Sequence, residues 1–328
     1  PAPIPFAPPV TWATFPLKSI QSAGVGISIC LFFWVELDDK ASVSRNPAVT
    51  LSDKPNFNKV EFLAYLAYCQ GLHWPGLNMS EHRTTNFYLV AAGDYHDIDF
   101  ARLELLKLIA ENDTYRVQVA SNYHDVEAIA AADILITYTC NLVPSEAEQM
   151  ALRDFVASGK RWFALHGTNA ILEFLEDGRV DCPETAPIMM ETLGSQFLSH
   201  PPIQPFTVHI SDPDHELVKG IEPFETDDEI YLCRIHGDIH HLLHSRFTGE
   251  GAGFVHSSWP DDVPHPVYYI NQVGQGEVLY LNLGHCRGHY DMQPLVDFYP
   301  TVERCAWDKP AFYELLRRGL KYCADRVA

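Results

Sequence analysis

Positive charge is scarce in this sequence. Its 328 residues include 23 Lys and Arg against 43 Asp and Glu, which gives a formal net charge of −20. The Lys and Arg residues are scattered and form no basic run. Nucleic acids and anionic membranes are bound through basic surfaces, so we expect neither as a partner.

Paired cysteines and long apolar runs are also missing. None of the eight cysteines forms a C-x-x-C pair, so we expect reduced thiols and a cytoplasmic location rather than a disulfide framework. The one long apolar run, residues 24–37, is shorter than the roughly 20 residues of a membrane span. Neither a closely preceding basic region nor a small-residue cleavage site accompanies it, so we do not expect a signal peptide.

The first 86 residues differ in character from the rest. Five of the first ten are proline, which predicts an extended and unpaired chain. Residues 59–70 could form a short helix, but the region contains no chemical motif. We therefore expect residues 1–86 to be an N-terminal extension, partly disordered or packed on a domain that spans residues 87–328.

From Phe87 onward, strand-like and helix-like segments alternate. Apolar, strand-like runs occupy residues 87–92, 133–139 and 161–165, and residues 115–120 alternate like a strand. Helical patterns occupy residues 97–112, 125–132 and 144–160. This alternation predicts a three-layer, doubly wound α/β fold with a mostly parallel sheet, whose ligands bind at the carboxyl ends of the strands. The second half is less regular, with strands expected at residues 206–210, 253–258, 266–272 and 276–284, a hairpin turn at 273–277 and a helix at 310–326.

Two histidines directly follow predicted strands. His166 comes after the strand at 161–165, on a sharp turn that we expect to lead into a helix over residues 168–176. His285 follows the strand at 276–284, and His289 stands four residues further on. Histidine at such a position can act as a general acid or base or as a metal ligand, although a single histidine is more often structural.

A carboxylate and a phenol form a further candidate pair. In the acidic stretch at 225–233, Glu229 and Tyr231 are two residues apart and would point the same way in an extended chain. Such a pair suits proton transfer or polyol binding, whereas the simpler interpretation is a solvent-facing acidic loop. His200 precedes two prolines, which hold its backbone extended. The sequence HPP is also typical of an ordinary surface turn.

These pieces, in this order, resemble the ThuA-like (trehalose utilisation) family. The resemblance covers about residues 87–327. It includes YHD (95–97), LHG, LG-x-x-F-x-x-HPP, DPDHELVKGI (212–221), DDEIY and LGH. It implies a fold similar to that of class I glutamine amidotransferases and flavodoxin-like proteins. In amidotransferases the turn that carries His166 here has a catalytic cysteine, so a glutaminase mechanism is not expected. The sequence also has no G-x-S-x-G motif of a serine hydrolase.

The resemblance implies sugar metabolism, with a disaccharide or glycoside such as a trehalose derivative in its 3-keto form, after a partner sugar dehydrogenase has acted. The hypothesis is a hydrolase, lyase or isomerase in which His166 and His285 form an acid–base pair or share a divalent metal, zinc or manganese, with Glu229. His200 would complete the site, and Asn169 and Tyr231 would bind sugar hydroxyls. The alternative is a non-catalytic sugar-binding or regulatory module on the same fold. Assembly into a homo-oligomer is plausible, without a defined stoichiometry.

The stretch RIHGDIHHLLH (234–244) contains four histidines, but their spacing fits a metal site poorly. Gly237 argues against one helix that would align His236 with His240, and no HExxH glutamate is present. We expect residues 240–244 to form a short helix. His236, with His289, is predicted to contribute to substrate binding at the rim of the site.

Overall fold

The computed structural model describes residues 84–327. The predictions for the extension at residues 1–86, including its short helix, therefore lie outside the described residues, except that Thr85 and Asn86 belong to the first strand. Within the described part, no helix is both long and apolar enough to cross a membrane.

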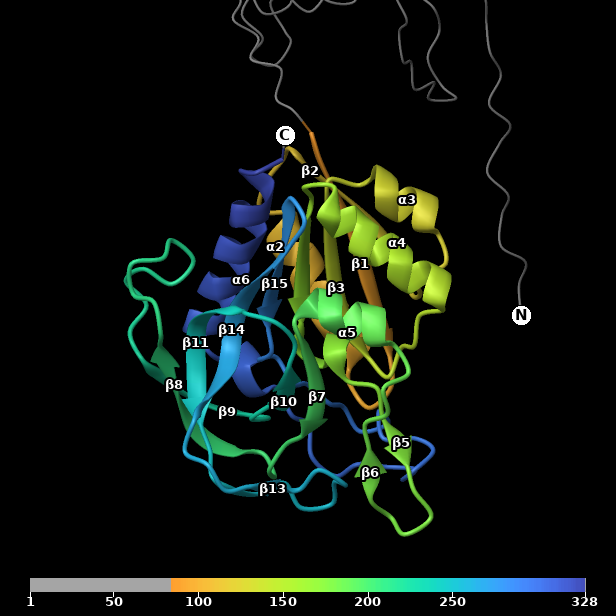
Figure 1. Cartoon of the computed structure of the whole chain (residues 1–328), viewed down its shortest axis with the longest axis vertical. Coiled ribbons are helices and arrows are strands. Elements are labelled where there is room, and N and C mark those ends of the chain that lie inside the picture. The colour runs from red at the N-terminus through yellow and green to blue at the C-terminus, as the bar shows by residue number, and fades with distance from the viewer. Residues whose placement is uncertain (1–83, 328) are drawn as a thin grey trace, which may run out of the picture. The chain divides into compact units, whose positions relative to one another are not determined.

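A nine-stranded sheet forms the centre of the fold (Figure 1). Its parallel half contains, in spatial order, β2 (Tyr115–Ala120), β1 (Thr85–Gly93), β3 (Ile134–Cys140), β4 (Arg161–Leu165) and β15 (Gly276–Leu281). The antiparallel half continues with β14 (Pro264–Val273), β11 (His240–Arg246), β8 (Gln204–Ile210) and β9 (Phe224–Asp228). The hairpin between β14 and β15 turns through two residues, Gly274 and Gln275, as predicted.

Helices cover both faces of the parallel half, because its central strands are apolar on both sides. All residues of β3 are buried. One core cluster joins the sheet to α2 (Ile98–Ile109) and α6 (Pro310–Ala324). A second joins it to α3 (Val126–Ala131), α4 (Glu146–Ala157) and α5 (Pro187–Leu193). This arrangement confirms the predicted three-layer α/β fold.

Polar side chains cap the first turns of three helices. The side chains of Asp97 and Asp125 accept backbone N–H groups of the first turns of α2 and α3. Ser145 and Glu148 form a reciprocal capping box at the start of α4.

The helix predicted for residues 168–176 is wrong. A single 3-10 turn, His166–Asn169, follows β4, and the chain then runs extended into β5 (Glu173–Phe174), which pairs with β6 (Val180–Asp181). The physical reason is that Ala170, Leu172 and Phe174, at every second position, all line one pocket, which requires an extended chain.

Two further local predictions are corrected. Residues 240–244 belong to strand β11 rather than a helix, and a register irregularity next to Leu243 allows Leu242 and Leu243 both to be buried. Within the strand predicted at 253–258, positive φ at Gly253 turns the chain, and only Ser258 belongs to a strand, β13 (Ser258–Trp259), which pairs with β12 (Gly249–Glu250). A separate pair consists of β7 (Ser195–Ser199) and β10 (Leu232–Ile235).

Sharp turns follow four of the parallel strands at their common carboxyl edge. Tyr95 after β1, Asn141 after β3 and His166 after β4 all have positive φ, between 44° and 67°, and Gly284 after β15 has φ of 113°. For non-glycine residues this conformation costs on the order of 1–3 kcal/mol and is found disproportionately at functional sites. The edge therefore concentrates backbone strain where the sequence predicts the site.

Candidate functional site

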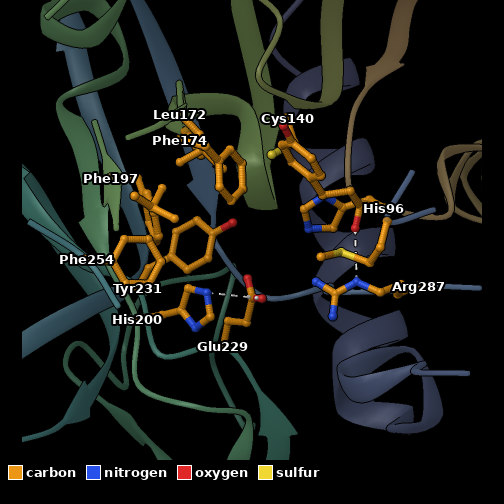
Figure 2. Close-up of a pocket in the computed structure, with 14 residues that line it drawn as sticks. His96, Cys140, Leu172, Phe174, Phe197, His200, Glu229, Tyr231, Phe254 and Arg287 are labelled. Atoms are coloured by element: carbon orange, nitrogen blue, oxygen red, sulfur yellow. Dashed lines mark hydrogen bonds and ion pairs between the residues drawn. The ribbon is translucent and has the colours of Figure 1, made fainter. Parts of the chain in front are cut away.

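A pocket of about 260 Å³ opens at this carboxyl edge (Figure 2). Its walls come from segments that are far apart in the sequence: the turn after β1, the last residue of β3, the extended run after His166, the end of β7 and the residues that follow β9. Val180, Phe254, Arg287 and Met292 complete the lining. The polar or charged side chains among the lining residues are Tyr95, His96, His200, Glu229, Tyr231 and Arg287.

Four buried side chains meet at the inner end of the pocket. One ligand atom from each of His96, His166, Glu229 and His285 lies within 4.8 Å of the others. The shortest approach is 2.8 Å, between His96 Nε2 and His166 Nε2. Glu229 lies 3.7 Å from His166 Nε2 through Oε2 and 3.2 Å from His285 Nδ1 through Oε1. The structure thus brings together the three residues predicted as the catalytic and metal-binding set.

Backbone carbonyl groups orient two of the imidazole rings. His96 Nδ1 lies 3.0 Å from the carbonyl oxygen of Asp94, and His166 Nδ1 lies 3.0 Å from that of Asn282. A carbonyl oxygen only accepts, so each Nδ1 carries the proton. In the neutral rings both Nε2 atoms therefore hold lone pairs, and these lone pairs face each other.

His285 is oriented by a carboxylate instead. Its Nε2 donates to Glu303 at 2.9 Å, and Arg287 holds the same carboxylate at 2.8 Å. Its Nδ1 faces Glu229 as a close ion pair and has no hydrogen-bond partner. An outer carboxylate that orients an imidazole is a common arrangement around protein metal ions.

Burial and mutual charge set the protonation states of the cluster. Burial lowers the pKa of His166 to about 3 and that of His96 well below its ordinary value. Burial also opposes the charge of His285, but the carboxylates of Glu229 and Glu303 outweigh it and raise the pKa of His285 to about 9. Burial would raise the pKa of Glu229, yet the surrounding histidines hold it well below its usual range. At neutral pH the cluster contains one carboxylate, one imidazolium and two neutral imidazoles.

Two of the predicted substrate-binding residues lie between this cluster and the open pocket. The Tyr231 hydroxyl is 3.3 Å from His166 Nε2, and its ring packs against Phe197 at a centroid distance of 4.6 Å. His200 Nε2 is 3.5 Å from Glu229 Oε1, while its Nδ1 donates to the carbonyl of Pro201. Both side chains line the pocket and can reach a bound molecule.

A buried carboxylate outside the pocket, Asp228, holds the loop that carries His285. Oδ1 accepts the backbone N–H groups of Glu229 at 2.8 Å and His285 at 3.3 Å. Oδ2 accepts those of Gly284 at 3.0 Å and Ala306 at 3.1 Å. Asp228 thereby joins the end of β9 to the turn after β15, and so places Glu229 beside His285.

The remaining predicted binding residues lie elsewhere. Asn169 is buried behind the pocket wall, where its amide donates to Ser195 at 2.6 Å. His236 lines a different hollow, beside Gly237 and α5. His289 Nδ1 lies 2.7 Å from the carbonyl oxygen of Tyr299. The structure brings none of these three side chains to the pocket lining.

Sequence reasoning did not assign a role to His96. It belongs to the YHD segment, directly after β1, which is the same kind of position that singled out His166 and His285. The available signal was therefore a third histidine at the carboxyl end of a parallel strand. Arg287 and Glu303 were also missed, because nothing local marks them.

Comparison with known proteins decides the family. A family model for trehalose utilisation proteins, ThuA, matches residues 88–299. The chain belongs to the ThuA family. A search of curated proteins gave no significant match.

Among solved structures, a ThuA-like protein from Bacteroides uniformis has 16% sequence identity, covers 76% of this chain and 95% of its own, and superposes with a TM-score of 0.53. A ThuA-like protein from Parabacteroides merdae has 15% identity, covers 74% and 90% of the two chains, and has a TM-score of 0.49. At this identity the B. uniformis structure shows a shared fold.

The donor set in this ThuA-family chain suits a divalent cation. Imidazole nitrogens and a carboxylate are the ligands that zinc and manganese accept in proteins. Each of the three histidines has its other ring nitrogen bonded to a carbonyl or carboxylate oxygen, which leaves one nitrogen per ring directed at the cluster.

Proposed function

We propose that this ThuA-family protein is an enzyme of carbohydrate catabolism that acts on a keto-sugar with the help of a divalent metal ion. The substrate class is a 3-keto disaccharide or glycoside, such as a trehalose derivative. One observation carries the proposal: the lone pairs of His96 Nε2 and His166 Nε2 face each other at 2.8 Å. Two lone pairs at that distance repel each other unless a proton or cation lies between them.

The spacing supports a metal ion. Zinc binds imidazole nitrogen at about 2.0–2.1 Å, so two nitrogens on one ion are separated by about 2.9–3.4 Å for ordinary ligand angles. The observed 2.8 Å is close to this range. Glu229 supplies a negative charge, and His285 would join as a ligand after it releases its Nδ1 proton. Zinc and manganese are both compatible with this donor set.

The chemistry of a keto-sugar fits the pocket. A carbonyl group at C3 acidifies the neighbouring C–H bond, and a bound divalent ion would polarise that carbonyl. His200, which lines the pocket beside Glu229, would accept the carbon-bound proton. It would then return this proton to the departing glycosidic oxygen, which leaves an unsaturated keto-sugar in a lyase, to which water would add in a hydrolase. In an isomerase it would return the proton to carbon. The Tyr231 hydroxyl would donate a hydrogen bond to a sugar oxygen.

The proposal requires an earlier oxidation of the sugar. No part of the mechanism above removes a hydride, so a separate sugar dehydrogenase must supply the 3-keto substrate. A functional link to such an enzyme is therefore part of the proposal.

The decisive experiment is incubation of the wild-type protein with 3-keto-trehalose and with trehalose, each with and without Zn²⁺ or Mn²⁺, followed by product analysis. We expect metal-dependent conversion of the keto-sugar alone. His96→Ala should lose most of the bound metal, measured by elemental analysis, together with activity. His240→Ala is the matched control, because His240 is exposed on β11 and pairs with Asp212.

Three results would contradict the proposal. Full activity after chelation, with no metal found by elemental analysis, would show that the reaction does not need a metal ion. Conversion by His166→Ala at the wild-type rate would show that the histidine cluster is not the catalytic site. Tight sugar binding without any conversion would favour the alternative, a non-catalytic sugar-binding module.

A further inference from the structure

We infer that the pocket holds a single sugar ring and that its mouth selects an apolar, aromatic aglycone over a second sugar. This inference rests on the proposed function, because it specifies the substrate class of the same site. It depends on the volume of the pocket, on the distribution of polar and apolar side chains within it, and on the exposure of Phe174, which lines it.

The volume limits how much of a substrate enters. About 260 Å³ is available. Pockets that enclose drug-sized ligands begin at roughly 300 Å³. A disaccharide has almost twice the atoms of a hexose and does not fit whole. One ring can enter, and the group attached to it must remain at the mouth.

The interior is divided between apolar and polar sides that suit one pyranose ring. Figure 2 shows Phe197, Phe254 and Tyr231 gathered on one side of the pocket, with His96 and Arg287 on the opposite side. The ring of Phe197 lies 4.6 Å from that of Tyr231 and 5.7 Å from that of Phe254. A sugar ring has an apolar C–H face and a polar edge. The aromatic side chains would cover the C–H face of the sugar, and the side with His96 and Arg287 would bind its polar edge.

The mouth is also apolar. Phe174 lines the pocket yet is 42% exposed, and its ring lies 5.5 Å from that of Tyr95. Met292 lines the pocket from the segment 288–302.

An exposed aromatic side chain that lines a pocket offers an apolar surface to a bound molecule. An aromatic aglycone that leaves the pocket past Phe174 would stack on its ring. The hydroxyl groups of a second sugar would lose water against Phe174 and Met292, which offer no hydrogen bonds in return. Discrimination therefore arises at the mouth, while the ring inside is recognised in the same way in both substrates.

Calorimetric titration of the metal-supplemented protein with 4-nitrophenyl α-glucoside, trehalose and glucose tests the inference directly. We expect the aryl glucoside to bind at least tenfold more tightly than trehalose, which corresponds to about 1.4 kcal/mol. Phe174→Ser should abolish this ratio and leave glucose affinity unchanged. Leu103→Ser is the matched control, because Leu103 is an exposed leucine on α2 and does not line the pocket.

The same pair of compounds in 3-keto form separates this inference from the proposed function. A higher kcat/KM for the aryl compound, lost in Phe174→Ser, supports both. Discrimination in binding with no turnover of either compound overturns the proposed function and leaves the ligand preference standing. Equal or tighter binding of trehalose, no detectable binding of either glycoside, or an equal loss for all three ligands in Phe174→Ser overturns the inference.

Discussion

Replacement of Asp228 by Asn tests how this fold holds its site together. Burial raises the pKa of Asp228 to about 6, so the side chain is a carboxylate at pH 8. Each oxygen accepts two backbone N–H groups. Asparagine keeps one oxygen and places an NH₂ group where the other was, so two buried N–H groups lose their acceptor. At about 1–3 kcal/mol for each group left unpaired, the expected loss is about 2–6 kcal/mol.

Urea unfolding at pH 8, followed by circular dichroism, measures this loss as a lower midpoint with an unchanged slope. Asp227→Asn is the matched control, because Asp227 is the neighbouring residue and is exposed. It should change stability by less than about 0.5 kcal/mol. If Asp228→Asn unfolds at the same midpoint as Asp227→Asn, the four hydrogen bonds do not support the loop and the reasoning fails.

Three further outcomes are expected. In chelator, the free energy of unfolding of the wild type should fall on the order of 2 kcal/mol from pH 7 to 9, because the folded pKa of His285, about 9, exceeds its unfolded value. The stability that this histidine contributes is fully present below its unfolded pKa and is lost as the pH rises through its folded pKa. An equally steep fall in His285→Gln would refute this explanation. Gly167→Ala should destabilise the protein by about 1–3 kcal/mol in thermal unfolding, because a Cβ there would lie 2.8 Å from the carbonyl oxygen of Thr139 and 2.9 Å from Cβ of Cys140. An unchanged midpoint would show that the turn relaxes at no cost in stability. Zinc at a hundred times its Kd should stabilise the wild type by about 2.7 kcal/mol but not His96→Ala, and equal stabilisation of both would place the metal elsewhere.

Local patterns predicted the parallel half of the fold well. Its central strands are short apolar runs between polar turns, and α2, α3 and α4 begin at capping residues, such as Asp97 and Ser145. These signals depend on residues within one element, so the sequence contains the information needed to read them, whereas α5 and α6 begin without a side-chain cap.

The prediction failed where burial, rather than local pattern, decides the structure. The apolar spacing of residues 168–176 is compatible with a helix, but the pocket places Ala170, Leu172 and Phe174 on one side of an extended chain. In β11, a register irregularity buries two consecutive leucines, which no regular period describes. In both cases tertiary contacts override the local preference.

The sequence by itself determined the family, the α/β alternation and the positions of His166 and His285 at the ends of strands. It also indicated Glu229, through its spacing from Tyr231. Only the tertiary structure decided that His96 joins them and that Asn169 points away from the pocket. The reason is that the cluster unites the ends of β1, β4, β9 and β15, whose spatial order differs from their order in the chain. The sheet order and the hydrogen bonds of Asp228 bring one ligand atom of each side chain within 4.8 Å of the others, and neither can be read from spacing along the sequence.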